Sequence, residues 1–354
     1  MTGTSKFRAL ILMLLLLTDQ RLLFLLYKWF KNVCILVNRS MLTFSCNCDP
    51  ANSISKSSCY DICELTSCED PMLPHVSTAV ILSMTNATQR HRNIETNQVT
   101  FNKLCPSLWM QCNNGFNNCD KSGVNHSAHD VLHAYLNVFS NTRGKGNILI
   151  LEDDVNFEYE GIKLRNHLQK VDDFVSTKLD VGAYTLGSLF KLAVPYKGTR
   201  HRRIVGRWAC AHAIIWSESL REKFLESVDI KAIPSDTIMH IDNSNFWPAD
   251  KGSVYTYYKP LATQLFPVTN NQSTWCLNCT DMNDKQRQNE EARWRKTSID
   301  FFKAFKMDKQ TYPGWGLAYG VGGFGICGNM ILIVAIVIII VIIVTCFVKL
   351  TQIL

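Results

Sequence analysis

"ILILEDDVNF", residues 148–157, joins a run of aliphatic side chains directly to three consecutive carboxylates, Glu152, Asp153 and Asp154. Such an apolar run is typical of a strand in a sheet that is covered on both faces. In α/β folds, ligands bind in the crevice at the carboxyl ends of the parallel strands. The three carboxylates are therefore expected at a ligand site, although acidic residues at a strand end also cap a following helix.

Neighbouring carboxylates raise one another's pKa unless a cation neutralises them. Oxygen ligands suit Mg²⁺ and Mn²⁺, and Mg²⁺ commonly binds through one or two carboxylates together with substrate phosphates. The triplet therefore predicts a phosphorylated ligand bound through a divalent metal ion.

The sequence around the triplet alternates between strand-like and helix-like segments. Short apolar runs predict strands at 77–84, 184–190, 210–217 and 253–260. Amphipathic or capped segments predict helices at 88–101, 127–139 and 217–227. Together they predict an α/β fold with a mixed sheet flanked by helices.

Both ends of the chain carry apolar segments. Residues 330–348 contain no charged side chain, and as a helix they would extend about 28 Å, which predicts a transmembrane helix at 329–349. Near the start, Lys6 and Arg8 precede an apolar run that Asp19 and Arg21 interrupt, so residues 1–37 are expected to be a signal anchor or signal peptide. The alternative is an amphipathic helix that lies on the membrane.

The chain between these ends has the features of a lumenal or extracellular protein. It contains most of the fourteen cysteines and five Asn-x-Ser/Thr sequons, at Asn38, Asn86, Asn125, Asn271 and Asn278. The cysteine-rich residues 38–75 are expected to form a disulfide-tied stem, with a zinc site as the alternative. Cysteines 105, 112 and 119 are expected on an irregular Asn-rich loop, and the Cys-x-x-Cys at 276–279 is expected to be a structural disulfide.

Charge and motifs argue against a nucleic-acid partner. The formal charge of +7 gathers near the chain ends and at 200–207, and no helix-turn-helix, zinc-finger or RNA-recognition pattern is present. The basic segment 199–207 either contacts a diphosphate or forms a solvated face that can meet anionic lipid.

Several motifs recur in the order known from one enzyme family. They are "ILSMTNATQRHRNI", "NHSAHDVLHAY", "LEDDV", "AYTLG", "ACAHAIIWSES", "IPSDTIMH" and "YYKPLATQLFP", spread over residues 76–275. In this order they resemble glycosyltransferase family 25, which includes lipooligosaccharide and procollagen galactosyltransferases. Cys210, His212 and Ile214 depart from the family pattern.

The resemblance implies a GT-A-type fold for residues 76–281 and an inverting transfer of a hexose, galactose or glucose, from a nucleotide-sugar donor such as a UDP-sugar. It implies Mn²⁺ or Mg²⁺ held by Asp153, Asp154 and Glu152. The family pattern points to Asp236 as the general base; His240 and Asp242 compete for that role, and Asp236 is otherwise an N-cap.

Two arginines and a histidine complete the expected site. Arg90 occupies the arginine position of the family's first turn, and Arg90 and Arg207 are expected to contact the diphosphate. His129, with His126 as its competitor, either orients the donor or satisfies the first turn of its helix.

These expectations describe a membrane-anchored enzyme whose catalytic domain faces the ER or Golgi lumen or the cell exterior, and which modifies a protein, glycan or lipid-linked acceptor. Residues 282–328 are either a juxtamembrane connector or the last helix of the domain. The alternative function is a non-catalytic membrane or viral envelope glycoprotein that keeps a glycosyltransferase-like fold.

Overall fold

The computed structural model describes residue 46 and residues 49–265, except 125, 188, 191, 197–198, 206–207, 210, 234–238 and 242–246; it also describes residues 286, 289 and 296 and the segments 316–319 and 324–327. The expected signal anchor, the expected transmembrane helix and the Cys-x-x-Cys lie outside these residues. Among the helices that are described, none combines the length and the apolarity that crossing a membrane requires.

The apolar run that begins at Ile148 forms a central strand, as predicted. Strand β5 (Ile148–Glu152) pairs in parallel with β3 (Thr78–Met84) and antiparallel with β12 (Ala213–Trp216). The four aliphatic side chains of β5 are completely buried. Strand β5 is therefore an interior strand that is shielded from solvent on both faces, and it ends at the first of the three carboxylates.

The main sheet is mixed and has the strand order β1-β2-β4-β3-β5-β12-β7-β13-β10-β9-β15-β16 among the described residues. Strands β4, β3 and β5 are parallel to one another, β7 is parallel to β13, and β12 runs antiparallel between the two groups. The remaining strands of this sheet are β1 (Ser53–Lys56), β2 (Tyr60–Ser67), β4 (Ser107–Asn113), β7 (Val181–Thr185), β9 (Leu192–Pro195), β10 (His201–Ile204), β13 (Ser253–Tyr257), β15 (Gly316–Tyr319) and β16 (Phe324–Cys327).

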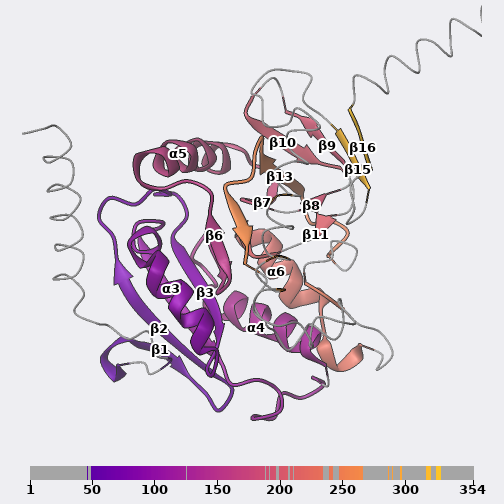
Figure 1. Ribbon diagram of the computed structural model, residues 1–354. Helices are drawn as coiled ribbons and strands as arrows, with labels where there is room; N and C mark the ends of the chain where they lie inside the picture. Colours follow the sequence, from indigo (N-terminus) through magenta and orange to yellow (C-terminus); the bar gives the residue numbers. More distant parts are fainter. Residues whose placement is uncertain are drawn as a thin grey trace, which may run out of the picture. The chain divides into compact units, whose positions relative to one another are not determined.

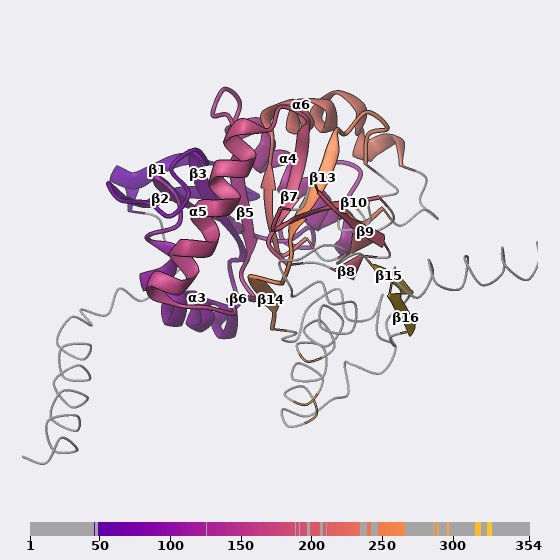
Figure 2. The same cartoon turned by 90° about the horizontal axis from the view of Figure 1, so that it is seen from above.

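Four α-helices with described bounds flank the sheet: α3 (Thr88–Phe101), α4 (Ser127–Asn141), α5 (Gly161–Thr177) and α6 (Glu218–Ser227). Helices α4 and α6 lie side by side (Figure 1), and their apolar residues share one core cluster with Val80, Ile148 and Ile150. Helix α5 lies on the other side of the sheet (Figure 2), where Phe174 packs against Tyr184 of β7. Two 3-10 helices are also described, Pro50–Asn52 and Ile230–Ala232.

Two short ribbons accompany the main sheet, and one of them leads to the carboxylates. Strand β14 (Ala262–Gln264) pairs with β6 (Val155–Phe157), the strand that follows the acidic turn; β8 (Leu189–Phe190) pairs with β11 (Trp208–Ala209). At Gly187, a Cβ atom would lie 1.8 Å from the Ala262 carbonyl oxygen. Only glycine permits this approach, which brings β14 across the end of β7.

The cysteine-rich stretch supplies β1 and β2 on one edge of the main sheet. Disulfides join Cys46 to Cys112 and Cys59 to Cys119, and Cys63 is disulfide-bonded as well. The expectation of an irregular loop is wrong for Cys112, because this residue lies in β4. The disulfides therefore tie the stretch before β3 to the sheet and to the loop after β4.

Candidate functional site at the end of β5

The three consecutive carboxylates diverge from the end of β5. Glu152 is the last residue of the strand and is half-buried, while Asp153 and Asp154 form the turn to β6 and are 2% and 3% exposed. Because the two aspartates are almost fully buried, their oxygens need partners inside the protein or a bound cation. The partners of each carboxylate therefore decide what the group can do.

Asp153 is held by residues of β3 and α3. Its Oδ2 accepts a 2.6 Å hydrogen bond from the Ser83 hydroxyl, and its Oδ1 forms a 2.8 Å ion pair with Nη1 of Arg90. The Asn93 amide donates to the carbonyl oxygens of Asp153 and Val155 at 2.9 and 3.0 Å. Both carboxylate oxygens of Asp153 are therefore engaged.

Asp154 and Glu152 share one partner. The Gln264 amide of β14 donates to Oδ2 of Asp154 at 3.1 Å and to Oε2 of Glu152 at 3.4 Å. The Tyr135 hydroxyl of α4 lies 3.3 Å from Oε1 of Glu152 and 3.1 Å from the Ala211 carbonyl oxygen. Oδ1 of Asp154 is buried and has no hydrogen-bond partner among the described residues. It is therefore a buried carboxylate oxygen that no hydrogen bond from the described residues satisfies.

Burial and one arginine set the pKa of the two aspartates. Burial raises the pKa of Asp153 and of Asp154 above the ordinary aspartate value, against the opposing effect of the Arg90 guanidinium. Burial lowers the pKa of Arg90, but the attraction of Asp153 and Asp154 outweighs it and raises that pKa overall. Among the described residues, Arg90 is the one cation that lowers the pKa of either aspartate, so one negative charge of this pair stays unbalanced when both are ionised.

The three carboxylates take different partners in the folded chain: Arg90 pairs with Asp153, whereas Gln264 bonds to Asp154 and Glu152. Within the described part of the chain, no group of three or more His, Cys, Asp or Glu side chains is arranged to hold a metal ion. Asp154 and Glu152 remain as a pair linked by Gln264. Two carboxylates suffice for Mg²⁺ or Mn²⁺ where substrate phosphates complete the coordination.

The start of α4 places the two candidate histidines. His126 caps the helix, with its Nδ1 accepting a hydrogen bond from the Ala128 N–H at 3.1 Å. His129 is 2% exposed, and its Nε2 accepts the Met239 N–H at 3.3 Å. The two rings pack edge to face with centroids 5.9 Å apart. His129 thus joins α4 to the segment 239–241.

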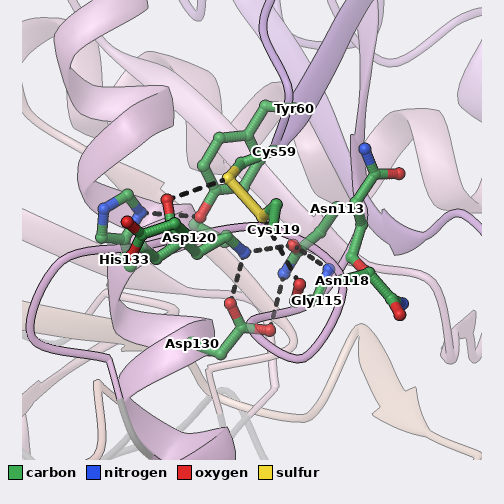
Figure 3. Close-up of polar contacts among 12 residues, drawn as sticks. Cys59, Tyr60, Asn113, Gly115, Asn118, Cys119, Asp120, Asp130 and His133 are labelled. Carbon is green, nitrogen blue, oxygen red and sulfur yellow. Dashed lines mark hydrogen bonds and ion pairs between the residues drawn. A yellow bond between two sulfur atoms is a disulfide. The ribbon is translucent and has the colours of Figure 1, made fainter.

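A buried polar network holds α4 against β2 and β4 (Figure 3). The Lys121 ammonium is bonded to Oδ1 of Asp130 and Oδ1 of Asn113 and lies 4.4 Å from the centre of the Tyr60 ring. The Tyr60 hydroxyl lies 2.7 Å from Nδ1 of His133, and the Asn113 amide donates to Asp130. The Cys59–Cys119 disulfide anchors the loop that carries Lys121. This network orients the helix that carries Tyr135 and His129.

The basic segment 199–207 does not form one uniform surface. Arg202 is buried and donates to the Thr199 and His201 carbonyl oxygens at 3.0 and 3.1 Å. Arg203 is exposed, whereas the expected diphosphate ligand Arg207 and the expected general base Asp236 lie outside the described residues.

Sequence patterns missed four residues of the site: Ser83, Asn93, Tyr135 and Gln264. Ser83 and Tyr135 lie in segments that read as apolar strand and helix, so their polar groups carry no distinct signal. Gln264 lies in "YYKPLATQLFP", a segment that the family resemblance includes, and this membership was the signal that could have identified it as a site residue.

No family model matches the chain, and no curated protein matches it. Among solved structures, A197 from STIV aligns over 55% of this chain and 87% of its own length, with 13% identity and a TM-score of 0.31. HddC from Yersinia pseudotuberculosis aligns over 51% of this chain and 69% of its own length, with 12% identity and a TM-score of 0.26. A putative glucose-1-phosphate thymidylyltransferase from Bacillus anthracis, solved in complex with a sucrose, aligns over 60% of this chain and 99% of its own length, with 12% identity and a TM-score of 0.31. These values assign neither a family nor a function to the chain.

Proposed function

We propose that the protein is a metal-dependent hexosyltransferase with a GT-A-type fold. It transfers a sugar from a nucleotide-sugar donor to a hydroxyl group of a protein, glycan or lipid-linked acceptor, on the lumenal or outer side of a membrane. The observation that carries the proposal is the buried Oδ1 of Asp154, which has no hydrogen-bond partner among the described residues while Gln264 holds Glu152 beside it.

This carboxylate oxygen has a physical reason to bind a cation. A buried acceptor without a partner destabilises a fold by about 1–3 kcal/mol, and by more when it is charged. Asp154 lies at the carboxyl end of a central parallel strand, where α/β folds bind ligands. A divalent ion there removes the penalty and balances the acidic turn.

The neighbouring residues then take distinct roles. Asp154 and Glu152 would hold Mn²⁺ or Mg²⁺, which when bound stabilises charge on the leaving nucleoside diphosphate. Asp153 is a positioning residue, because its oxygens hold Ser83 and Arg90. A guanidinium has five N–H donors, so Arg90 can bond to Asp153 and to a phosphate at once.

The remaining roles rest on the family resemblance alone. Asp236 would accept the proton of the acceptor hydroxyl group, Arg207 would contact the diphosphate, and His129 would orient the donor from the start of α4.

The test is release of UDP from UDP-galactose and UDP-glucose by the full-length protein in detergent, with Mn²⁺ or with EDTA. Wild type should release UDP only with the metal, and Asp154→Asn should reduce the rate at least about 100-fold. Asp172→Asn is the matched control: Asp172 is similarly buried but lies in the second half of α5, where it is bonded to the backbone N–H and the ring of His75. Metal-independent release, or full activity of Asp154→Asn, contradicts the proposal.

A second function is favoured by one observation, the engagement of both Asp153 oxygens by Ser83 and Arg90. An acidic turn that is closed by its own arginine suits a surface glycoprotein that keeps the fold without catalysis. Glycan-array binding that persists in Asp154→Asn, together with no turnover of any donor by wild type, would support this function over the first.

A further inference from the structure

A cluster of cations and aromatic rings lies at the start of α5, at the opposite end of the β6–β14 ribbon from Gln264. Nζ of Lys163 and Nζ of Lys259 both lie over the Tyr159 ring, 4.6 and 4.5 Å from its centre. Lys163 comes from α5, whereas Lys259 comes from the turn between β13 and β14. Lys259 also lies 5.3 Å from the centre of the Tyr258 ring. Two separate elements thus bring positive charge to one tyrosine.

His167 extends the cluster along α5. Its ring packs on Tyr159 and on Tyr257, with centroids 5.0 and 5.5 Å apart, and its Nδ1 lies 3.3 Å from the Tyr257 hydroxyl. Burial, and then Lys259, Arg200, Lys163 and Lys170 in that order, lower the pKa of His167 to about 4. Four cations therefore surround a neutral, half-buried imidazole.

The helical spacing makes this cluster a stripe. Lys163, His167 and Lys170 recur at intervals of four and three residues, which places them on one side of α5. Within the part of the chain that the structure describes, neither Lys163 nor Lys170 forms an ion pair. Glu160 and Asp173 are the exposed acids near the two ends of this stretch, and the cations outnumber them.

Exposed apolar side chains lie near both ends of α5. Ile162, in the first turn of α5, is 71% exposed, and Leu179, just beyond the helix, is fully exposed. Basic side chains beside exposed aliphatic and aromatic groups are the combination found where helices lie on membranes. A soluble phosphate ester would use the lysines but would make no use of Ile162.

We propose that the face formed by Tyr159, Ile162, Lys163, Lys170 and Lys259 docks onto an anionic phospholipid bilayer. The lysines meet lipid phosphates, and Ile162 enters the boundary between headgroups and acyl chains. The charge-free residues 330–348, which the sequence predicts to span a membrane, would tether the chain to the same bilayer.

The inference is independent of catalysis, and its test does not use activity. The full chain is reconstituted in nanodiscs of phosphatidylcholine alone, or with 30% phosphatidylserine, and hydrogen exchange of residues 161–170 is measured. Exchange should slow in the anionic discs, and 0.5 M NaCl should abolish the difference. Loss of each lysine weakens attraction to the anionic surface roughly fivefold, so Lys163→Glu with Lys170→Glu should remove the protection.

The matched control reverses the same amount of charge elsewhere. Lys56 and Lys103 are exposed and lie on β1 and after α3, so Lys56→Glu with Lys103→Glu should keep the protection. The proposal is overturned if residues 161–170 exchange equally fast in both kinds of disc. It is also overturned if the two double variants lose the same amount of protection. Protection by 10 mM glycerol phosphate in neutral discs also overturns it, because that result assigns the cluster to a soluble phosphate ester.

Discussion

Replacing Asp154 by Asn should stabilise the metal-free protein while it removes a proposed metal ligand. The side chain is 3% exposed, and its Oδ1 has no hydrogen-bond partner among the described residues. Asn has the same shape, carries no charge and can still accept the Gln264 hydrogen bond through its own Oδ1. The substitution therefore removes a buried charge at little cost in packing.

The sign follows from the pKa of Asp154, which burial raises in the folded protein. A raised pKa means that this group's contribution to stability is complete below the unfolded value of 3.8 and is lost as pH rises through the folded pKa. The Asn variant has no such loss, so its advantage should appear above pH 4 and reach a plateau. An unsatisfied buried acceptor is worth about 1–3 kcal/mol, and the new amide N–H keeps part of that penalty, so we expect a gain of about 1–2 kcal/mol at pH 7.

The assay is urea denaturation of both proteins in EDTA, followed by tryptophan fluorescence, with Asp172→Asn as control. Asp172 is bonded through both oxygens to His75, so its variant should lose about 1.5–3 kcal/mol. Mn²⁺ at 100 times its Kd should stabilise wild type by about 2.7 kcal/mol and should leave Asp154→Asn unchanged. A loss for Asp154→Asn in EDTA like that of the control, or equal stabilisation of both proteins by Mn²⁺, would refute the reasoning.

Three further perturbations test the scaffold. Removing the Cys59–Cys119 disulfide, which spans 60 residues, should lower the free energy of unfolding by about 4 kcal/mol in urea denaturation, and an unchanged midpoint would contradict its role. Burial lowers the pKa of His212 to about 4, although a hydrogen bond with the Ala262 backbone opposes this shift. Because the unfolded chain takes up a proton near pH 6.5 and the folded chain does not, the free energy of unfolding should fall by roughly 3 kcal/mol as pH drops from 6.5 to 4. His212→Gln should flatten that pH profile, and an equally steep profile would rule out this histidine as the cause. Lys121→Met leaves the Asp130 carboxylate buried without its cation and should cost about 3–5 kcal/mol by thermal or urea unfolding, whereas a neutral result would show the pair to be dispensable.

The sequence was most informative where a single periodicity dominates. Residues 148–151 are uniformly apolar and form the buried central strand, and Leu132, Tyr135 and Phe139 recur at helical spacing and line the core face of α4. Helix α5 carries the same kind of signal, since Leu164, Leu168, Val171 and Val175 are its buried residues. Its spacing could have been recognised before the structure.

Strand β4 shows why other elements were missed. Its sequence contains Gln111, Cys112 and Asn113, which suggest a polar loop tied by disulfides. Both polar side chains are buried, because Gln111 donates to the Ala134 carbonyl oxygen at 2.9 Å and Asn113 bonds to Asp130. Their partners belong to α4, so a pattern local to the strand could not reveal that these groups are satisfied.

The acidic triplet was recognisable as a site, but its division of labour was not. Successive residues of an extended strand and the following turn point in different directions, so the three adjacent carboxylates take different partners. Asp153 turns to Arg90, 63 residues away, while Gln264, 110 residues from Asp154, bridges Asp154 and Glu152. Sequence order ranks Asp153 and Asp154 as equal ligands. The fold separates them, because the β14 amide bonds to Asp154 and Glu152, whereas the α3 arginine bonds to Asp153.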